Sequence, residues 1–486
     1  MNSIIEFLDL EDANINITDI SISETTKTIT LETNPVPHYC PICSCRMYSK
    51  GIKNREIQHP ILQDNYNVVL ILKQRRWKCT SGLCNYSSNE EFRFVDKRRR
   101  STNATDILIV QTFRDFSLSA VSIAEKFHTT DTHVMEVFNR YVSMSRLPLS
   151  DIISVDEVCL DMDPHCKYGL VIQDFHTGDP IDLLISRWVE VTEPFFVSIP
   201  IEERAKVKYL ISDMYDPYIA YVDKYFPNAV SVVDAFHVIK WMITKIDNYI
   251  RSLIKDFKSR DRAIFLEKHP NGPDPNDSVL VSDEVYLLSK YRWLILSNQC
   301  NIKYHADPRI DRHFRRLMNT YDYEDALYRI SKRLFTLREL KELYITFNTV
   351  YAGKPDQARP ALDELINRYL TSGDSIFIEL AATLKKHKDS IINSFVMAKK
   401  FGKGKLYDTR LSNGPIESIN RSIKDMKRNG RGYRNFEHLR NRFLYGTRHN
   451  PEIQLSSKPN LGFASIDSED DFSFFMAEQK ENTDEI

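Results

Sequence analysis

The amino-acid sequence predicts a multidomain α/β protein. Its 486 residues exceed one ordinary domain, and about three domains are expected. Five of the eight cysteines lie within residues 40–84, among runs with strand-like alternation. From residue 151 onward, apolar runs of strand type are followed by a long stretch with helical periodicity.

Composition places the chain among soluble globular proteins, because 42% of its residues are hydrophobic and 27% are charged. The net charge of −1 does not indicate nucleic-acid binding. Between Arg421 and Arg442, however, eight Lys and Arg stand against two acids, and a local basic patch is what DNA binding requires. The N-terminus lacks a basic leader and no apolar run could span a membrane, so we expect a cytoplasmic protein.

The first predicted domain, residues 1–95, is a β-rich zinc ribbon. Cys40 and Cys43 form a Cys-x2-Cys pair, and a β-hairpin's length of chain separates them from the Cys-x4-Cys pair of Cys79 and Cys84. Two such pairs on turns can hold Zn²⁺ through four thiolates. Cys45 is a spare with poorer spacing, and the alternative is a set of buried or free cysteines.

The second predicted domain, residues 96–150, is a helix-turn-helix that follows a basic junction at 97–100. Helical patterns at 117–127 and 129–142 share apolar residues, and Thr130 or Asp131 can cap the second helix. On that helix His133, Asn139 and Arg140 are candidates to contact the DNA groove. The alternative is a small helical hairpin without a DNA role.

Residues 151–245 predict the first part of a catalytic domain. Strand patterns occupy 152–160, 168–174 and 181–187 at hairpin spacing, and two more follow at 207–213 and 229–234 with a helix between them. Three antiparallel strands followed by a β-α-β-α sequence is the order of an RNase H-like fold, with a mixed five-stranded sheet.

Three acids are the catalytic candidates. Asp156 lies within the first, central strand, and Asp213 ends the neighbouring fourth strand. A carboxylate on an apolar strand is costly unless it is paired or bound to metal. Glu417, at the start of a late amphipathic helix, is the best third acid. Three such acids can hold two Mg²⁺ or Mn²⁺ ions for phosphoryl transfer. Glu157 should point to the opposite face.

Residues 246–400 predict a large all-α insertion that separates Asp213 from Glu417. Helical patterns include residues 311–317, and 399–405 reads as a flexible basic loop. Trp293 could stack on a DNA end, and the alternative is packing within the insertion. Residues 401–450 should supply the last helix and a basic segment of the catalytic domain. Residues 451–486 read as an acidic, disordered tail.

The whole chain, from about Cys40 to about Tyr445, resembles the DDE transposases of bacterial insertion sequences, most closely the ISL-three group. The matching stretches occur in the family's order; they include Cys40-Pro-Ile-Cys43, Arg75-Arg-Trp-Lys-Cys79, Ser154-Val-Asp156-Glu157, Ser212-Asp213-Met, Asp234-Ala-Phe-His237-Val, Arg292-Trp-Leu-Ile-Leu and Ser412-Asn-Gly-Pro-Ile-Glu417-Ser-Ile-Asn420.

The resemblance implies site residues. Asp156, Asp213 and Glu417 would form the catalytic triad, and the four paired cysteines would bind zinc. Asp234 and His237 match a family Asp-x2-His element near the active site; the alternative is a helix start with a satisfied histidine. Apart from the resemblance, the charge pattern of the Glu417 helix and its C-terminal end predicts DNA contacts by Asn420, Lys424, Lys427, Arg428 and Arg431; the alternative is a solvated helix with salt bridges.

The predicted function is therefore a transposase that binds terminal inverted repeats and then cleaves and joins DNA strands. Its partners would be double-stranded DNA, both repeats and target, and a second copy of the chain at synapsis. It would act in the bacterial cytoplasm, on the nucleoid. The alternatives are a domesticated DNA-binding regulator that does not cut, and a nuclease without strand transfer.

Overall fold

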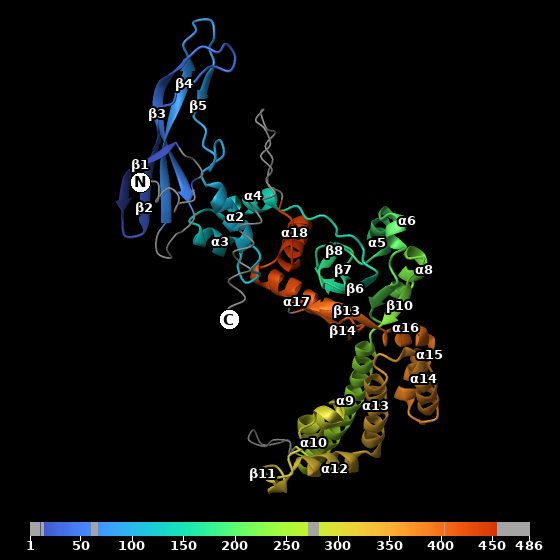
Figure 1. Cartoon of the computed structure of the whole chain (residues 1–486). Coiled ribbons are helices and arrows are strands. Elements are labelled where there is room, and N and C mark those ends of the chain that lie inside the picture. Colours follow the sequence, from blue (N-terminus) through green and yellow to red (C-terminus); the bar gives the residue numbers. More distant parts are fainter. Residues whose placement is uncertain (1–9, 11–13, 60–66, 271–280, 403, 454–486) are drawn as a thin grey trace. The chain divides into compact units, whose positions relative to one another are not determined.

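The computed structural model describes residues 10, 14–59, 67–270, 281–402 and 404–453. The chain divides into two compact units (Figure 1). The first comprises residues 1–144 with 450–486, and the second comprises residues 145–449. The predicted tail at 451–486 lies almost entirely outside the described residues.

The first unit contains a five-stranded sheet in the order β1-β2-β4-β3, with β5 paired to β4. The strands are β1 (Ile15–Ile22), β2 (Thr26–Thr33), β3 (Met47–His59), β4 (Asn67–Cys79) and β5 (Ser87–Asn89). The β2 and β4 strands are parallel, whereas β3 and β4 form a long antiparallel ladder. Alternate residues of β4, including Leu70 and Leu72, are fully buried, as their period-2 pattern requires.

Three helices follow the sheet: α2 (Asn103–Thr112), α3 (Ala120–Lys126) and α4 (Asp131–Tyr141). Thr130 caps α4, its hydroxyl accepting a hydrogen bond from the amide of His133 at 3.2 Å. The two helices expected from the patterns at 117–127 and 129–142 are thus present. Helix α4 packs against both α2 and α3.

The second unit is built on a mixed five-stranded sheet in the order β10-β9-β6-β7-β8. The strands are β6 (Ile152–Cys159), β7 (Tyr168–Asp174), β8 (Pro180–Leu184), β9 (Tyr209–Ser212) and β10 (Val230–Val233). The β6, β7 and β8 strands are antiparallel, whereas β9 runs parallel to both β6 and β10. The predicted strand order is therefore observed, with β6 at the centre.

Short helices connect the strands of this sheet. They are α5 (Val189–Ser198), α6 (Ile201–Arg204), α7 (Asp216–Ile219) and α8 (Tyr221–Tyr225). Phe196 of α5 and Tyr225 of α8 stack with ring centroids 5.0 Å apart, over one apolar face of the sheet. This packing leaves the ends of β6 and β9 as the place where polar groups gather.

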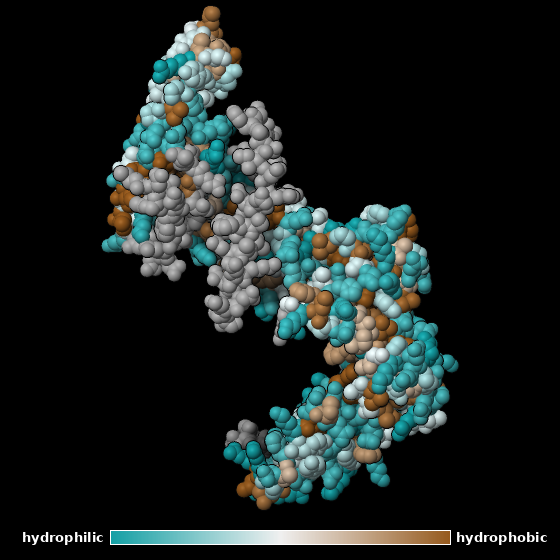
Figure 2. Space-filling model, viewed as in Figure 1, coloured by the Kyte–Doolittle hydropathy of each residue, from teal (hydrophilic) through white to brown (hydrophobic). Residues whose placement is uncertain are grey.

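The insertion begins with α9 (Ala235–Lys268), a helix of 34 residues. It continues through α10 (Asp283–Tyr291), α11 (Trp293–Leu296), η1 (Gln299–Asn301), α12 (Thr320–Ile330), α13 (Lys332–Val350), α14 (Pro355–Leu370), α15 (Ser375–Lys386) and α16 (Lys388–Asn393). One apolar core joins these helices, and residues on the surface shown in Figure 2 are mostly hydrophilic. None of the described helices is long and apolar enough to cross a membrane.

Two β-hairpins correct the prediction of an all-α insertion with a flexible basic loop. Residues expected to be helical at 311–317 contribute instead to β11 (Arg309–Asp311) and β12 (Arg316–Met318), which pair antiparallel. The expected loop forms β13 (Met397–Gly402) and β14 (Lys405–Arg410). Sequence patterns missed both because each strand is short and highly charged, so no apolar alternation marks it.

The chain then returns to the sheet as α17 (Gly414–Asn429) and α18 (Phe436–Thr447). Ile416, Ile423 and Met426 of α17 are fully buried, as the helical period predicts. Helix α17 packs against β6, and α18 packs against β8. The coarse prediction of a multidomain α/β protein is confirmed, and the end of the second unit has two helices where one was predicted.

Candidate functional site

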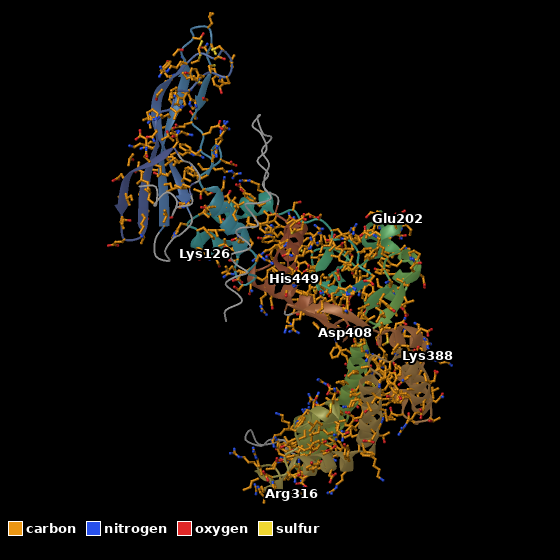
Figure 3. All side chains as sticks on the ribbon, in the orientation of Figure 1. Lys126, Glu202, Arg316, Lys388, Asp408 and His449 are labelled. Atoms are coloured by element: carbon orange, nitrogen blue, oxygen red, sulfur yellow. The ribbon has the colours of Figure 1, made fainter. Side chains whose placement is uncertain are left out.

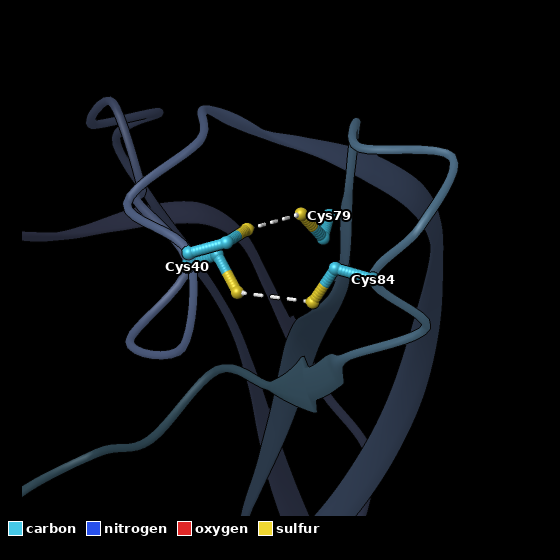
Figure 4. A group of neighbouring side chains, drawn as sticks. Cys40, Cys79 and Cys84 are labelled. Carbon is cyan, nitrogen blue, oxygen red and sulfur yellow. Dashed lines mark hydrogen bonds between the residues drawn. The ribbon is translucent and has the colours of Figure 1, made fainter.

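Four cysteine thiols form a cluster in the first unit (Figure 4). The Sγ atoms of Cys40 and Cys84 are 3.7 Å apart, and those of Cys43 and Cys79 are 3.4 Å apart. All four Sγ atoms lie within 4.8 Å of one another, and Cys45 is not part of the group. Four thiolates bound to one Zn²⁺ at about 2.3 Å place their sulfurs about 3.8 Å apart, so the cluster fits a zinc ion.

The three candidate acids come from three elements of the second unit. Asp156 lies within β6 opposite Val171 of β7, and Asp213 directly follows β9. Glu417 lies in the first turn of α17, the helix that packs against β6. Between residues 213 and 417 the chain thus adds β10 to the sheet, forms the insertion and returns to pack α17 beside β6.

The electrostatics show that these carboxylates are neighbours. The pKa of Asp156 is raised to about 7; burial is the largest cause, and the charges of Asp213 and Glu417 add to it, against a lowering hydrogen bond from the amide of Glu157. Burial also raises the pKa of Asp213, whose Oδ1 is buried without a hydrogen-bond partner among the described residues. Such groups are expensive to ionise, and a cation between them would relieve that cost.

Asn420 lies one helical turn after Glu417 and contacts the same site. Its side-chain amide donates to Oδ2 of Asp156 at 2.8 Å and to the backbone oxygen of Glu157 at 3.2 Å. The residue is only 5% exposed. Sequence reasoning predicted a DNA contact here, whereas the structure places the amide against a candidate catalytic carboxylate.

The Asp234 and His237 element also belongs to this site. Nε2 of His237 lies 4.0 Å from Oε1 of Glu417, and its charge lowers the pKa of Asp213 against the larger effect of burial. Asp234 caps α9 by accepting from the amide of Phe236 at 2.9 Å. Its other oxygen accepts from the amide of Asn413, the N-cap of α17, at 2.7 Å. One buried carboxylate therefore ties together the starts of both helices.

Arg187 is a site neighbour that sequence reasoning missed. Its guanidinium donates to Glu157 and stacks over the ring of Tyr215, 5.4 Å from the centroid. It also lowers the pKa of Asp213, although burial is the larger, raising effect. The available signal was that Arg187 is a cation at the end of the largely apolar run 181–187, which forms the strand pattern after the one that follows Asp156 and Glu157.

The cations of α17 and of the residues that follow it occupy different environments. Arg421, Lys424 and Arg431 are exposed, and Arg428 pairs with Asp425 at 2.8 Å while 76% exposed. Lys427 instead donates to the backbone oxygen of Leu160. In α18, Arg440 binds Asp182 at 2.6 Å. Some cations of the basic segment, such as Lys427 and Arg440, therefore make contacts within the fold.

In the first unit, the candidate groove residues are partly engaged. Nε2 of His133 lies 3.3 Å from the hydroxyl of Ser101, and Arg140 pairs with the buried Asp106 at 3.5 Å. Asn139 is exposed on α4. The structure places these three residues on one helix of eleven residues.

Trp293 is not part of the insertion core. It is 43% exposed and lines an open groove of about 720 Å³ together with Lys290, Arg292, Asn298 and Asn301. Its neighbours Leu294 and Ile295 are fully buried instead. The alternative interpretation of Trp293 as core packing is therefore wrong, and a stacking role stays a prediction.

The acid site offers hard oxygen ligands of the kind that Mg²⁺ and Mn²⁺ prefer. The unpaired buried oxygen of Asp213 and the raised pKa of Asp156 both fit a divalent cation. Across the described residues, only the cysteine cluster has three or more ligand atoms within 4.8 Å of one another. The acids are thus neighbours without a closed ligand shell.

Comparisons with known proteins agree with this geometry. The family model for ISL3-type DDE transposases, described as transposase, matches residues 153–443, which is more than half of the chain and includes all three acids. The transposase for insertion sequence element IS1001 of Bordetella parapertussis is 22% identical over 408 residues, which cover 82% of this chain and 86% of that protein.

A transposase for insertion sequence element IS1557 of Mycobacterium tuberculosis is 24% identical over 284 residues. The alignment covers 58% of this chain and 56% of the relative, so the chain matches little more than half of that protein's length. Since the family model spans the sheet, the insertion and the helix that carries Glu417, the chain belongs to the ISL3-type family of DDE transposases.

Proposed function

We propose that the protein binds the terminal inverted repeats of an insertion sequence and catalyses DNA strand cleavage and strand transfer. The observation that carries the proposal is the gathering of Asp156, Asp213 and Glu417 from three elements, with two of their pKa values raised. Structural ion pairs would lower the pKa of a carboxylate, whereas burial together with neighbouring acids raises it, which is typical of catalytic sites.

In the proposed mechanism, Asp156, Asp213 and Glu417 would hold two Mg²⁺ or Mn²⁺ ions. When bound, these ions would supply Lewis-acid stabilisation of charge on the transferring phosphate. Asn420 orients the carboxylate of Asp156, and His237 lies beside Glu417. Water would cleave the strand, and the freed 3′-hydroxyl would attack target DNA in line, so positioning contributes much of the rate.

The domain assignment accompanies this proposal. Residues 151–245 and 401–450 would form an RNase H-like catalytic domain around an insertion at 246–400. Residues 1–95 would be a zinc ribbon and 96–150 a helix-turn-helix, which together would recognise the repeats. The exposed cations Lys424, Arg428 and Arg431 would neutralise backbone phosphates, which makes binding sensitive to salt.

Trp293 would stack on a base at the DNA end, because its exposed ring borders a groove that also carries Arg292 and Lys290. Two copies of the chain would hold the two ends during synapsis. The reaction would take place in the cytoplasm, on nucleoid DNA.

A strand-transfer assay tests the proposal. The purified protein is incubated with Mg²⁺, a labelled duplex that carries the inverted repeat flanking its gene, and a plasmid target. Joined products are expected. Cleavage without joining would identify a nuclease, and binding without cleavage would identify a regulator, so either result would overturn the proposal.

Asp156→Asn and Glu417→Gln test the acids directly. Each is expected to lower the cleavage rate at least about 100-fold, because the site would lose a carboxylate that holds the cations beside the reacting phosphate. Asp425→Asn on the same helix is the matched control, since Asp425 pairs with Arg428 away from the acids. If either acid variant kept full activity, the site assignment would be wrong.

A further inference from the structure

The β11–β12 hairpin presents four arginines to solvent. Arg309, Arg312, Arg315 and Arg316 are all exposed, and Figure 3 shows Arg316 at the end of the insertion. Residues 303–316 contain five Lys and Arg against two Asp, in a chain whose net charge is −1. Among the described residues, none of the four arginines forms an ion pair with an acid. The tip of the insertion is thus a concentrated cationic surface.

The buried Asp311 holds the base of this surface in place through hydrogen bonds. Its Oδ2 accepts from the hydroxyls of Tyr286 and Tyr323 at 2.8 Å each and from that of Tyr291 at 3.3 Å. Its Oδ1 accepts from the amide of His313 at 2.8 Å and from that of Phe314 at 3.1 Å. Asp311 is one of the two acids in residues 303–316. Because its oxygens are occupied by hydrogen bonds inside the fold, it does not neutralise the exposed arginines.

The position of the hairpin follows from α9. The helix starts beside the acid site, where His237 faces Glu417. Farther along, Arg260 pairs with Glu284 at the start of α10, and the neighbouring Asp283 accepts from His313 of the hairpin at 2.8 Å. Between His237 and Arg260 a straight helix rises about 35 Å at about 1.5 Å per residue. One turn of B-form DNA is also about 34–36 Å long.

We propose that the arginine hairpin, Arg309–Arg316, is a phosphate-binding surface for double-stranded DNA. It contacts the duplex about one helical turn, or about ten base pairs, from the phosphate held at the acid site. Arginine suits this role because its guanidinium binds phosphate oxygens in a bidentate manner. The inference rests on the proposed function for the acid site, and it assigns the insertion a DNA-binding role of its own.

A binding experiment tests the surface. Arg309, Arg312, Arg315 and Arg316 are changed together to Gln, and affinity for a 40-base-pair duplex is measured by fluorescence anisotropy across a salt series. A loss of about tenfold or more at 100 mM salt is expected. The dependence of log affinity on log salt should also become shallower by about two to four units, because each phosphate contact contributes about 0.9.

Two controls sharpen the result. Gln at Lys354, Arg359, Arg368 and Lys385 removes the same charge from exposed positions of α14, α15 and the residue that precedes α14, and should change affinity less than about twofold. Lys at the four hairpin positions should restore most of the affinity. The inference is overturned if the hairpin and control variants behave alike. Poly-glutamate serves as a probe for an acidic polypeptide partner, and a hairpin variant that loses binding to it but keeps its affinity for the duplex would also overturn the inference.

A crosslinking experiment tests the location. The photoreactive residue p-benzoylphenylalanine replaces Ile310, which is 75% exposed on the hairpin. In a complex with the inverted-repeat duplex, crosslinks are expected about ten base pairs from the cleaved phosphate. Crosslinks confined to the cleavage site, or absent from the duplex, would overturn the inference. If the unmodified protein binds through the hairpin but never cleaves, the proposed function fails while the binding surface stands.

Discussion

At the scale of single residues, Asn420 has an environment that its sequence position does not reveal. It follows Glu417 by three positions, so both side chains lie near one face of α17. Its amide reaches Asp156, which is 264 positions away in sequence. This bond supports Oδ2 of Asp156, while the amide of Glu157 donates to Oδ1 and the charges of Asp213 and Glu417 repel the carboxylate. In this structure the amide of Asn420 is therefore directed at Asp156, and a DNA contact by Asn420 stays a prediction.

Asn420→Asp should be more damaging than Asn420→Ala. The alanine variant removes the donor to Oδ2 of Asp156 and leaves this partly buried acceptor oxygen unpaired. The free energy of unfolding should fall by about 1–3 kcal/mol. The aspartate variant adds another acid beside Asp156, and both folding and activity should fall further. Urea denaturation and the cleavage rate measure the two effects. A fully active aspartate variant would contradict this role.

Asp234 should also be a positioning residue. In Asp234→Asn, only one side-chain oxygen remains to accept from the amides of Phe236 and Asn413. We expect the cleavage rate to fall while affinity for duplex DNA stays within about twofold, because α17 loses its anchor but its exposed cations remain. Asp223→Asn, on α8, is the control. Equal losses of rate and affinity would argue against positioning.

At the scale of elements, local patterns predicted most strands and helices. Alternation marked β1 and β2, and continuous apolar runs marked β6 and β7 because both faces of a central strand are buried. The hairpins β11–β12 and β13–β14 were not predicted, because their residues are charged and mostly exposed. Their strand pairing depends on packing at their bases, which periodicity does not encode.

The cysteine element should bind one zinc ion per chain. Cys43→Ser should abolish zinc binding, because one of four thiolates is lost. Cys45→Ser is a close control, since Cys45 is equally exposed and lies outside the cluster. Native mass spectrometry measures the bound metal. Zinc retained by the Cys43 variant, or lost from the Cys45 variant, would require a different set of ligands.

The β13–β14 hairpin should be held more firmly in mild acid. His176 contacts the backbone oxygen of Lys399 through Nδ1 and Asp151 through Nε2, so only the protonated ring donates both hydrogen bonds. Burial lowers the pKa of His176, but these acceptors outweigh it and the net pKa is raised. The pKa of Asp151 is lowered, because His176 and Lys208 outweigh the opposing effect of burial.

The sign of the pH effect follows. The contribution of His176 is complete below its ordinary pKa of about 6.5 and is lost as pH rises through its higher folded value. That of Asp151 is present above about pH 4 and is lost in stronger acid. The difference in Tm between the protein and His176→Gln should therefore be largest near pH 5–6 and shrink above pH 7. A difference that grows with pH would contradict this pairing.

At the scale of the whole molecule, the two units have separate apolar cores. One core surrounds Leu70 and Leu72 in the first unit, and others surround Ile153 and Met242 in the second. Calorimetry should accordingly show two unfolding transitions. A zinc chelator should lower the Tm of one transition alone, because the cysteine cluster belongs only to the first unit. One transition that shifts as a whole would contradict this.

The sequence by itself predicted the strands of the mixed sheet, the two short-spaced cysteine pairs and the three candidate acids. The strands follow from local periodicity, Asp156 from the cost of a carboxylate on an apolar strand, and Glu417 from its place at the start of an amphipathic helix. Only the tertiary structure decided which groups support the acids. Asn420, Asp234 and Arg187 act through contacts with residues up to 264 positions away, and no local pattern records such contacts.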